Sequence, residues 1–307
     1  MSVTLSRLSP SALSQLLCEQ GAVIQTGRYV ARIRSQVPHL AKDLLTLYGH
    51  TPLRQDDAHD FLIDLTPGKG LRRWVHPYVN FALYGNQPFT PLPIAQSTPL
   101  LEWGMNWCVS NQDHRALIIH AAVVERNGRA IIMPGQPGAG KSTLCAALVA
   151  SGVCRLLSDE LTLMCHKTAE VLPNPRPISL KNRAIDIIAE RFPDIPRTAT
   201  VQDTLKGAVS LFRAPQSAIE GTFISAKPGI VVFPRYRAGL AQPLVERVGR
   251  GRTFVELANQ SFNYPVLGEQ GFATLQQHVS QCRAYRLEYA GDLDQAIDIM
   301  DELLHDE

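Results

Sequence analysis

Residues 135–143 of this 307-residue chain read Gly-Gln-Pro-Gly-Ala-Gly-Lys-Ser-Thr, and this stretch constrains the fold more than any other. It fills the pattern Gly-x-x-x-x-Gly-Lys-Ser, in which glycines allow backbone N–H groups to surround a phosphate. The lysine supplies a mobile positive charge, and the serine hydroxyl is a hard oxygen ligand for Mg²⁺. The sequence therefore predicts a loop that binds the phosphates of a nucleoside triphosphate.

The predicted nucleotide contacts extend over the whole loop. Lys141 is expected at the β- and γ-phosphates, and the Ser142 hydroxyl is expected on the metal ion. ATP and Mg²⁺ are the cofactors that such a loop implies. The residues predicted to bind nucleotide here are Gly135, Gln136, Pro137, Gly138, Ala139, Gly140, Lys141, Ser142 and Thr143.

The flanking residues place this loop between a strand and a helix. Arg129–Pro134 is a short apolar run that predicts a buried strand, and Leu144–Ala150 is a helix-forming run. A helix that begins at the loop directs its partial positive charge at the phosphates. Asn127-Gly128 predicts a two-residue hairpin turn after an earlier strand at Ala116–Glu125. Because the strand that feeds the loop is then the second arm of an antiparallel hairpin, we expect an α/β fold with a mixed sheet.

Length and composition predict two globular domains. A chain of 307 residues corresponds to about two domains, and 45% hydrophobic residues suffice for a buried core. A proline-broken stretch at Gln87–Pro93 leads us to expect an N-terminal α+β domain at residues 1–112 and a phosphate-loop domain at residues 113–307. The 30 basic and 28 acidic residues give a net charge of +2, which offers no support for nucleic-acid binding.

The sequence gives no indication of a membrane protein or of a metal-binding cysteine pattern. Residues 1–10 lack the basic start and apolar core of a signal peptide, and no apolar run approaches the ~18 residues that span a bilayer. The six cysteines form no Cys-x-x-Cys pair, which argues against a zinc ribbon. Because a nucleotide-binding loop also draws on the cytosolic nucleotide pool, we expect a cytoplasmic protein.

Acidic residues follow the next predicted strand. The short run Cys154–Glu160 is apolar at its centre and ends in Asp159 and Glu160. Asp159 has two candidate roles, as the base that accepts a proton from an attacking hydroxyl or as a ligand of Mg²⁺, against the alternative of a strand-end cap. Glu160 is either a further metal ligand or a solvated residue.

Histidine and basic residues complete the candidate site. His120 lies on the predicted strand before the loop, where a histidine is either a core residue or reaches the active site. Phosphoryl transfer needs cations around the γ-phosphate oxygens. Four basic residues are candidates for this role, and one or two of them are expected to contact the nucleotide: Arg176, Lys181, Lys206 and Arg235. Of these, Arg235 is included in the predicted nucleotide site.

With these pieces in view, the chain resembles the bacterial proteins called HprK-related kinase A, over nearly its full length. It resembles the HPr kinase/phosphorylase family over residues 115–240 alone. Both groups belong to a branch of phosphate-loop folds that also includes the phosphoenolpyruvate carboxykinases. The residues that carry the resemblance are Leu101–Cys108, His120–Val124, Gly135–Thr143, Leu156–Glu160, Arg176–Lys181, Asp203–Gly207, Phe233–Tyr236 and Phe262–Tyr264.

The resemblance implies a role for several residues. HPr kinases transfer a phosphoryl group from ATP to a protein serine and can reverse the reaction. They form hexamers, but the stretch before residue 115 is unlike theirs, so the sequence leaves a homo-oligomer open. His120 matches a family histidine, Asp159 matches the catalytic base, and Glu160 stands where a second Asp is usual. The family's Glu-x-Arg-Gly stretch has no acidic counterpart in Arg176–Lys181, which argues against HPr as the substrate.

Two functional hypotheses follow. The first is an ATP- and Mg²⁺-dependent kinase that phosphorylates a hydroxyl acceptor, either a protein or peptide Ser/Thr or a small molecule, with Asp159, His120 and Lys141 as catalytic residues. The alternative is a nucleotide-gated binding module without phosphoryl transfer. In the alternative, the polar and weakly periodic segment Arg197–Pro228 is a mobile loop or lid that orders on ATP.

Overall fold

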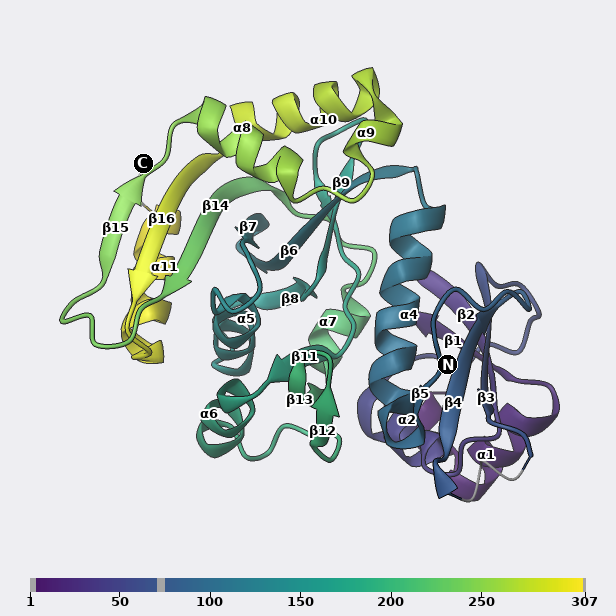
Figure 1. Ribbon diagram of the computed structural model, residues 1–307. Coiled ribbons are helices and arrows are strands. Elements are labelled where there is room, and N and C mark those ends of the chain that lie inside the picture. The colour runs from purple at the N-terminus through teal and green to yellow at the C-terminus, as the bar shows by residue number, and fades with distance from the viewer. Residues whose placement is uncertain (1–3, 71–74, 306–307) are drawn as a thin grey trace. The chain divides into compact units, whose positions relative to one another are not determined.

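Three β-sheets and their helices are described for residues 4–70 and 75–305 in a computed structural model of the chain (Figure 1). The elements divide into two units. The first contains residues up to Val109 together with Arg176–Ile219, and the second contains Ser110–Pro175 and the residues from Glu220 onward. No helix in the described ranges is both long and apolar enough to cross a lipid bilayer.

The first unit is built on a five-stranded sheet in the order β1-β2-β3-β4-β5. β2 and β3 are parallel and the other neighbours are antiparallel. The Ser9 side chain caps the first helix by accepting from the Ala12 N–H at 3.1 Å, and Pro10 occupies its first position. The elements are η1 (Leu5–Arg7), α1 (Pro10–Glu19), β1 (Ala22–Thr26), β2 (Tyr29–Ser35), α2 (Leu40–Tyr48), β3 (Phe61–Pro67), β4 (Tyr78–Leu83), β5 (Leu92–Pro93), η2 (Ile94–Gln96) and α4 (Ser97–Gln112).

A small three-stranded sheet in the order β11-β13-β12 also belongs to the first unit. Its elements are β11 (Ile178–Lys181), α6 (Arg183–Arg191), β12 (Val201–Thr204), β13 (Gly207–Phe212) and α7 (Gln216–Glu220). The segment Arg197–Pro228, predicted as a mobile loop or lid, contains two paired strands and a helix, so its regular structure was not predicted. β12 is exposed along most of its length, so its residues lack the alternation of apolar side chains that identifies a strand in the sequence.

Long-range contacts attach this small sheet to the first unit. The Arg213 guanidinium donates to the carbonyls of Leu45, at 2.9 Å, and Thr46 at the end of α2. The Gln96 amide donates to the Asp203 carbonyl at 3.1 Å. The first unit is thus discontinuous in sequence, and it differs from the expected division at residue 112 because Arg176–Ile219 joins it.

The second unit contains an eight-stranded sheet in the order β10-β9-β6-β7-β14-β16-β15, with β8 also paired to β6. β7, β14 and β16 run parallel, and all other pairs are antiparallel. The predicted α/β class with a mixed sheet is confirmed. The strands are β6 (Ala116–Arg126), β7 (Arg129–Pro134), β8 (Arg155–Ser158), β9 (Leu161–Cys165), β10 (Val171–Leu172), β14 (Lys227–Tyr236), β15 (Leu244–Arg247) and β16 (Arg283–Tyr289).

Helices cover both faces of this sheet (Figure 1). α8 (Arg250–Asn259) and α10 (Glu269–Ser280) supply Leu257, Leu275 and Val279 to a core cluster, and the short α9 (Tyr264–Leu267) lies between them. Alternate residues of β6, from Leu117 to Val123, belong to the same cluster, so α8 and α10 cover that face. α5 (Lys141–Ala150) and α11 (Leu293–His305) pack on the other face.

Candidate functional site

A tight hairpin delivers the chain to the phosphate loop. Asn127 and Gly128 have φ angles of 52° and 77°, the left-handed conformation that a two-residue hairpin turn requires at both central positions. Arg126 pairs with Arg129 across this turn, and the antiparallel ladder continues to Ala121 opposite Pro134. The predicted hairpin is confirmed, and the loop begins at the end of its second arm.

The loop connects β7 to α5 in the predicted order. Gly138 and Gly140 have φ angles of +85° and +93°, which side-chain-bearing residues rarely adopt. The Ala139 N–H donates to the Gln136 carbonyl at 3.1 Å, so the middle of the loop forms a tight turn. Helix α5 starts at Lys141, and Ser142 and Thr143 lie in its first turn. The N-terminal amides of a ten-residue helix therefore lie directly beside the loop.

Two tyrosines from distant strands support the loop. The Tyr289 hydroxyl on β16 donates to the Gly140 carbonyl at 3.3 Å, and a β-carbon on Gly140 would lie 2.3 Å from that hydroxyl. The Tyr236 N–H at the end of β14 donates to the Ala139 carbonyl at 3.2 Å. Burial raises the pKa of Tyr289 to about 12, so its hydroxyl stays protonated as a donor. Sequence reasoning missed Tyr289, since no local pattern links it to a loop so far away along the chain.

The lysine side chain lies along the loop. The Lys141 ammonium donates to the carbonyls of Gly135 and of Gln136, the latter at 3.3 Å, and the residue is buried. An ammonium group in this position can exchange backbone carbonyls for phosphate oxygens without moving the backbone. The structure thus brings the predicted charge and the predicted loop together.

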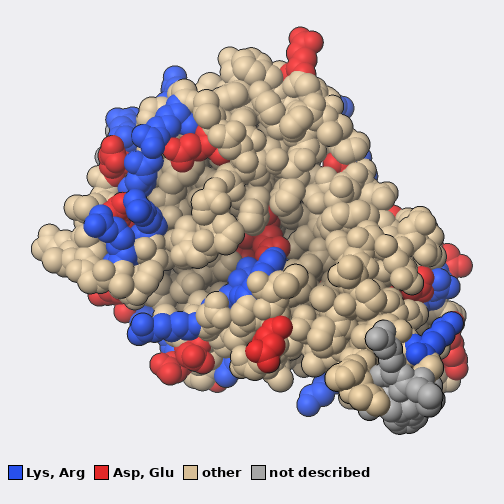
Figure 2. Space-filling model, viewed as in Figure 1, with Lys and Arg blue, Asp and Glu red and all other residues tan. Residues whose placement is uncertain are grey.

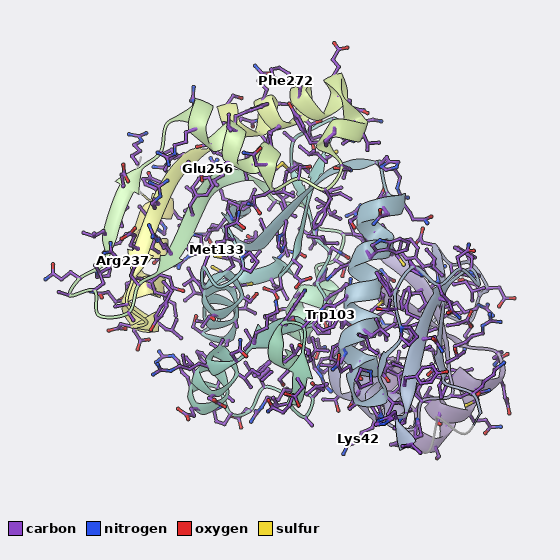
Figure 3. All side chains as sticks on the ribbon, in the orientation of Figure 1. Lys42, Trp103, Met133, Arg237, Glu256 and Phe272 are labelled. Atoms are coloured by element: carbon purple, nitrogen blue, oxygen red, sulfur yellow. The ribbon has the colours of Figure 1, made fainter. Side chains whose placement is uncertain are left out.

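A bulge in β8 determines where Asp159 lies. Val124 pairs with Leu156 and Val123 pairs with Ser158, so β8 has one extra residue at this point. His120 pairs with Leu161 on β9, and the register between these pairs places Asp159 opposite Ala122. Met133, labelled in Figure 3, pairs with Ala122 from the other side. Asp159 is thus two strand spacings, roughly 10 Å, from the strand that enters the loop.

Electrostatics agree with this register. Ala122 lies on the sheet face opposite the α8 and α10 cluster, which is the face that α5 covers. Burial raises the pKa of Cys145 well above its ordinary value, and the negative charge of Asp159 raises it further. Cys145 follows Lys141 by one helical turn on the same side of α5. The Asp159 carboxylate is therefore buried on the α5 side, near the start of that helix.

His120 lies where the phosphate loop leaves the sheet. Its sequence neighbour Ala121 pairs with Pro134, the last residue of β7. At His120, Gln260 takes the place of β7 beside β6. Its carbonyl accepts a hydrogen bond from the His120 N–H at 2.7 Å. The imidazole is partly buried, with its centroid 5.7 Å from that of the Phe262 ring. By strand alternation His120 shares the α5 face with Asp159.

Glu160 occupies a different position from its neighbour. The same register sets Glu160 opposite Ala121, which faces the α8 and α10 cluster. Within the described residues, no group of three or more His, Cys, Asp or Glu side chains could hold a metal ion. Mg²⁺ with nucleotides usually takes part of its coordination from phosphate oxygens and water.

Of the four candidate cations, Arg235 belongs to the unit that carries the loop, and Arg176, Lys181 and Lys206 belong to the first unit. Arg235 is 66% exposed, and its guanidinium lies 3.3 Å from the Glu288 carboxylate on the α8 side of the sheet. In the first unit, Arg176 forms a buried ion pair with Glu102, and the Lys206 ammonium lies 5.0 Å from the centroid of the Trp103 ring. Lys181 ends β11.

No protein-family model matches this chain, and no curated protein matches it either. The chemistry of the site therefore rests on its geometry. The second unit brings together a glycine-containing loop, a helix N-terminus, a buried lysine and a buried carboxylate on one face of the sheet.

Proposed function

We propose that the chain is an ATP- and Mg²⁺-dependent kinase that transfers the γ-phosphoryl group to a hydroxyl acceptor. The observation that carries this proposal is the position of Asp159 on the α5 face, near enough to Cys145 of that helix for its charge to raise the pKa of the thiol. Phosphate-binding loops alone support binding, whereas a buried carboxylate on the same face adds a group that can act on an incoming hydroxyl.

The loop and the lysine bind and orient the phosphates in this proposal. Backbone N–H groups at the start of α5 and the Lys141 ammonium stabilise charge on the β- and γ-phosphate oxygens, and they are held in place before the nucleotide binds. The contacts from Tyr236 and Tyr289 fix the loop backbone, so little reorganisation is needed on binding.

Asp159 acts on the acceptor. Its carboxylate accepts the proton of the attacking hydroxyl, and His120 on the same face orients the carboxylate or the phosphate. Mg²⁺ would neutralise phosphate charge when bound. Two hard oxygen donors on the α5 face suit it: Ser142 in the first turn of α5 and Asp159, two strands away from β7. Glu160 remains a candidate for a water-mediated contact only.

The same features support a fold family and a cellular location for the chain. A hairpin-fed loop in a mixed sheet supports the branch of HPr kinases and phosphoenolpyruvate carboxykinases, and with it membership of the HprK-related kinase A group. A protein that uses ATP in this way is expected in the cytoplasm. In the binding-module alternative, the segment that would order on ATP is Arg197–Pro228, which contains β12, β13 and α7.

The fate of γ-labelled ATP tests the proposal. Purified protein is mixed with labelled MgATP and a lysate of the source organism, and label is followed on macromolecules, small molecules and free phosphate. We expect label on an acceptor with the wild type, and none with Lys141→Ala or Asp159→Asn. Label in free phosphate alone would support the binding module, and undiminished transfer by Asp159→Asn would remove the assigned base.

A further inference from the structure

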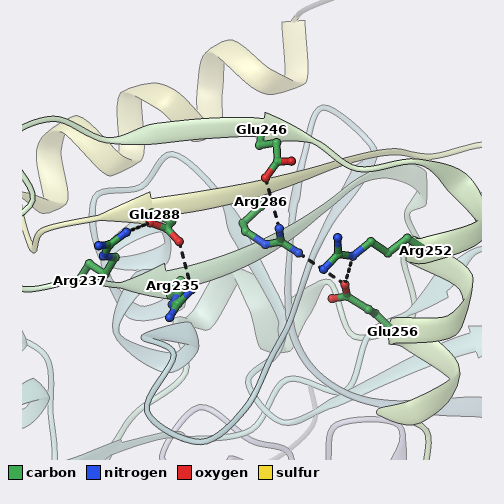
Figure 4. Close-up of polar contacts among 7 residues, drawn as sticks. All are labelled: Arg235, Arg237, Glu246, Arg252, Glu256, Arg286 and Glu288. Carbon is green, nitrogen blue, oxygen red and sulfur yellow. Dashed lines mark hydrogen bonds and ion pairs between the residues drawn. The ribbon is translucent and has the colours of Figure 1, made fainter.

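A cluster of arginines and glutamates crosses the second unit on the α8 side of the sheet. We call it the arginine surface, and Figure 4 shows its ion pairs. Figure 2 shows basic side chains gathered over β15, β16 and the start of α8. The residues of the arginine surface are Arg235, Arg237, Glu246, Arg252, Glu256, Arg286 and Glu288.

One end of the arginine surface is built around Glu288. This carboxylate is only 13% exposed and lies 3.3 Å from Arg235 and 2.8 Å from Arg237. Arg237 lowers the pKa of Glu288, so the carboxylate stays ionised and holds both guanidinium groups in place. The two arginines remain 66% and 56% exposed, which leaves positive charge facing solvent.

The other end connects strands to α8. Arg286 on β16 lies 3.3 Å from Glu246 on β15 and 3.6 Å from Glu256 on α8, and Arg252 lies 2.8 Å from Glu256. Figure 3 labels Arg237 and Glu256, which mark the two ends of the surface. Since four arginines face three glutamates, the surface has a surplus of positive charge.

β15 borders this surface and forms the edge of the sheet. It is the last strand in the sheet order, paired to β16, and all four of its residues are exposed. Leu244 and Val245 are 54% and 45% exposed, on an edge whose backbone N–H and C=O groups can pair with another strand. An exposed apolar edge of this kind is a common site for strand addition by a partner.

The surface also adjoins the phosphate loop. Tyr236, whose N–H donates to Ala139 of the loop, stands between Arg235 and Arg237 in the sequence. The Arg237 N–H donates to the Tyr289 carbonyl at 2.9 Å. Arg237 is thus the next residue after Tyr236, whose backbone holds the loop. The Arg237 end of the arginine surface therefore lies at the edge of the sheet where the phosphate loop begins, while Arg235 and Arg286 are on the α8 face and Asp159 is on the α5 face.

We propose that an acidic, extended segment of a partner protein docks here, pairing its backbone with β15 and its carboxylates with the arginine surface. Taken with the proposed function, on which this part rests, the docked segment belongs to the phosphoryl acceptor. A protein fits better than a nucleic acid, because the exposed apolar side chains of Leu244 and Val245 on an open strand edge suit an extended peptide.

Fluorescence anisotropy with a labelled peptide of alternating glutamate and valine tests the docking. Such a peptide presents its carboxylates on one face when extended. We expect binding to the wild type, and at least about tenfold weaker binding to Arg237→Glu combined with Arg252→Glu. We expect an N-methylated version of the peptide, which cannot pair along a strand, to bind weakly as well.

Matched controls separate this proposal from simple charge attraction and from the kinase proposal. Lys227→Glu changes an exposed charge at the opposite end of β14 and should leave peptide binding intact. Lys141→Ala should weaken MgATP binding about 10- to 100-fold and preserve peptide binding. Equal loss in Lys227→Glu, unchanged binding of the N-methylated peptide, or tighter binding of single-stranded RNA than of the peptide would overturn the docking proposal.

A competition assay tests the acceptor assignment. The acidic peptide should inhibit the label transfer seen in lysate. Transfer that continues at saturating peptide would show that the surface binds some other partner, while the kinase proposal would stand. Peptide binding without any nucleotide binding by the wild type would instead remove the kinase proposal and leave the docking surface in place.

Discussion

Two arginine–glutamate clusters in this molecule have opposite environments. In the first unit, Arg176 and Glu102 are 7% and 5% exposed and lie 2.6 Å apart. Arg176 also donates to the Asn106 side chain at 2.6 Å, and the Tyr48 hydroxyl donates to Glu102 at 2.6 Å. On the arginine surface of the second unit, Arg235 and Arg237 share Glu288 while remaining mostly exposed.

The difference separates a structural arginine from arginines that can bind a ligand. Arg176, just before β11, donates hydrogen bonds to Asn106 and Glu102 on α4. Its positive charge is therefore neutralised within the first unit. The exposed arginines contribute little to stability, because solvent screens their ion pairs. An arginine that sequence reasoning selects as a nucleotide contact can thus belong to either class, and only its partners distinguish them.

Arg176→Met gives the largest expected effect. Removing one partner of a buried ion pair leaves the Glu102 charge uncompensated, which should cost about 3–5 kcal/mol of unfolding free energy. All three tryptophans lie in the sequence of the first unit, at positions 74, 103 and 107, so denaturant unfolding followed by tryptophan fluorescence reports on that unit.

A double variant checks the cause of this loss. Glu102→Gln removes the second charge while keeping an oxygen for the Tyr48 hydroxyl, so Arg176→Met with Glu102→Gln should recover most of the stability. If the double variant is as unstable as Arg176→Met alone, packing rather than buried charge accounts for the effect.

His278 extends the comparison to a buried titratable group in the second unit. Burial lowers its pKa from 6.5 to about 4, and the Nδ1–H bond to the Ala169 carbonyl at 2.8 Å offsets this in part. The folded state therefore binds fewer protons than the unfolded state, and stability falls as the pH drops from 6.5 to about 4. The full loss is about 3 kcal/mol.

Hydrogen exchange of α10 peptides across this pH range measures the effect. His278→Gln keeps a donor for Ala169 and cannot be protonated, so it should flatten the pH dependence between 6.5 and 4. An equally steep dependence in His278→Gln would assign the acid sensitivity to other groups.

Arg237→Gln gives the smallest expected effect on the stability of the fold, together with a measurable loss of peptide affinity. Arg237 is 56% exposed and Glu288 keeps its ion pair with Arg235, so the unfolding midpoint should not change measurably. Affinity for the alternating glutamate and valine peptide should fall severalfold, which anisotropy detects. A marked loss of stability with unchanged peptide affinity would show that Arg237 has a structural role, like Arg176, and does not bind the peptide.

Local features of the fold were predictable from the sequence, and long-range ones were not. The Asn127-Gly128 turn, strand β7 and helix α5 were predicted because turn residues and apolar runs specify them within a few positions. The pairing of β12 with β13 was missed, since it depends on β11 and on contacts such as that of Arg213 with α2.

The candidate site shows the same division. The loop and Lys141 follow from the sequence alone, and Asp159 was selected because it ends a strand. The reason that Asp159 shares a face with His120 is the extra residue in β8, which no periodicity reveals. Tyr289 supports Gly140 from β16, which lies two strands from β7 in the sheet and far from the loop in the sequence.

Isothermal titration calorimetry of MgATP with the wild type and Lys141→Ala tests the central claim most directly. Lys227→Ala, which removes an exposed lysine from β14, is the matched control. The account predicts binding by the wild type and by Lys227→Ala, and about 10- to 100-fold weaker binding by Lys141→Ala, the loss expected from charge-assisted hydrogen bonds. Equal MgATP affinity in all three proteins would contradict the assignment of residues 135–143 as a nucleotide-binding loop.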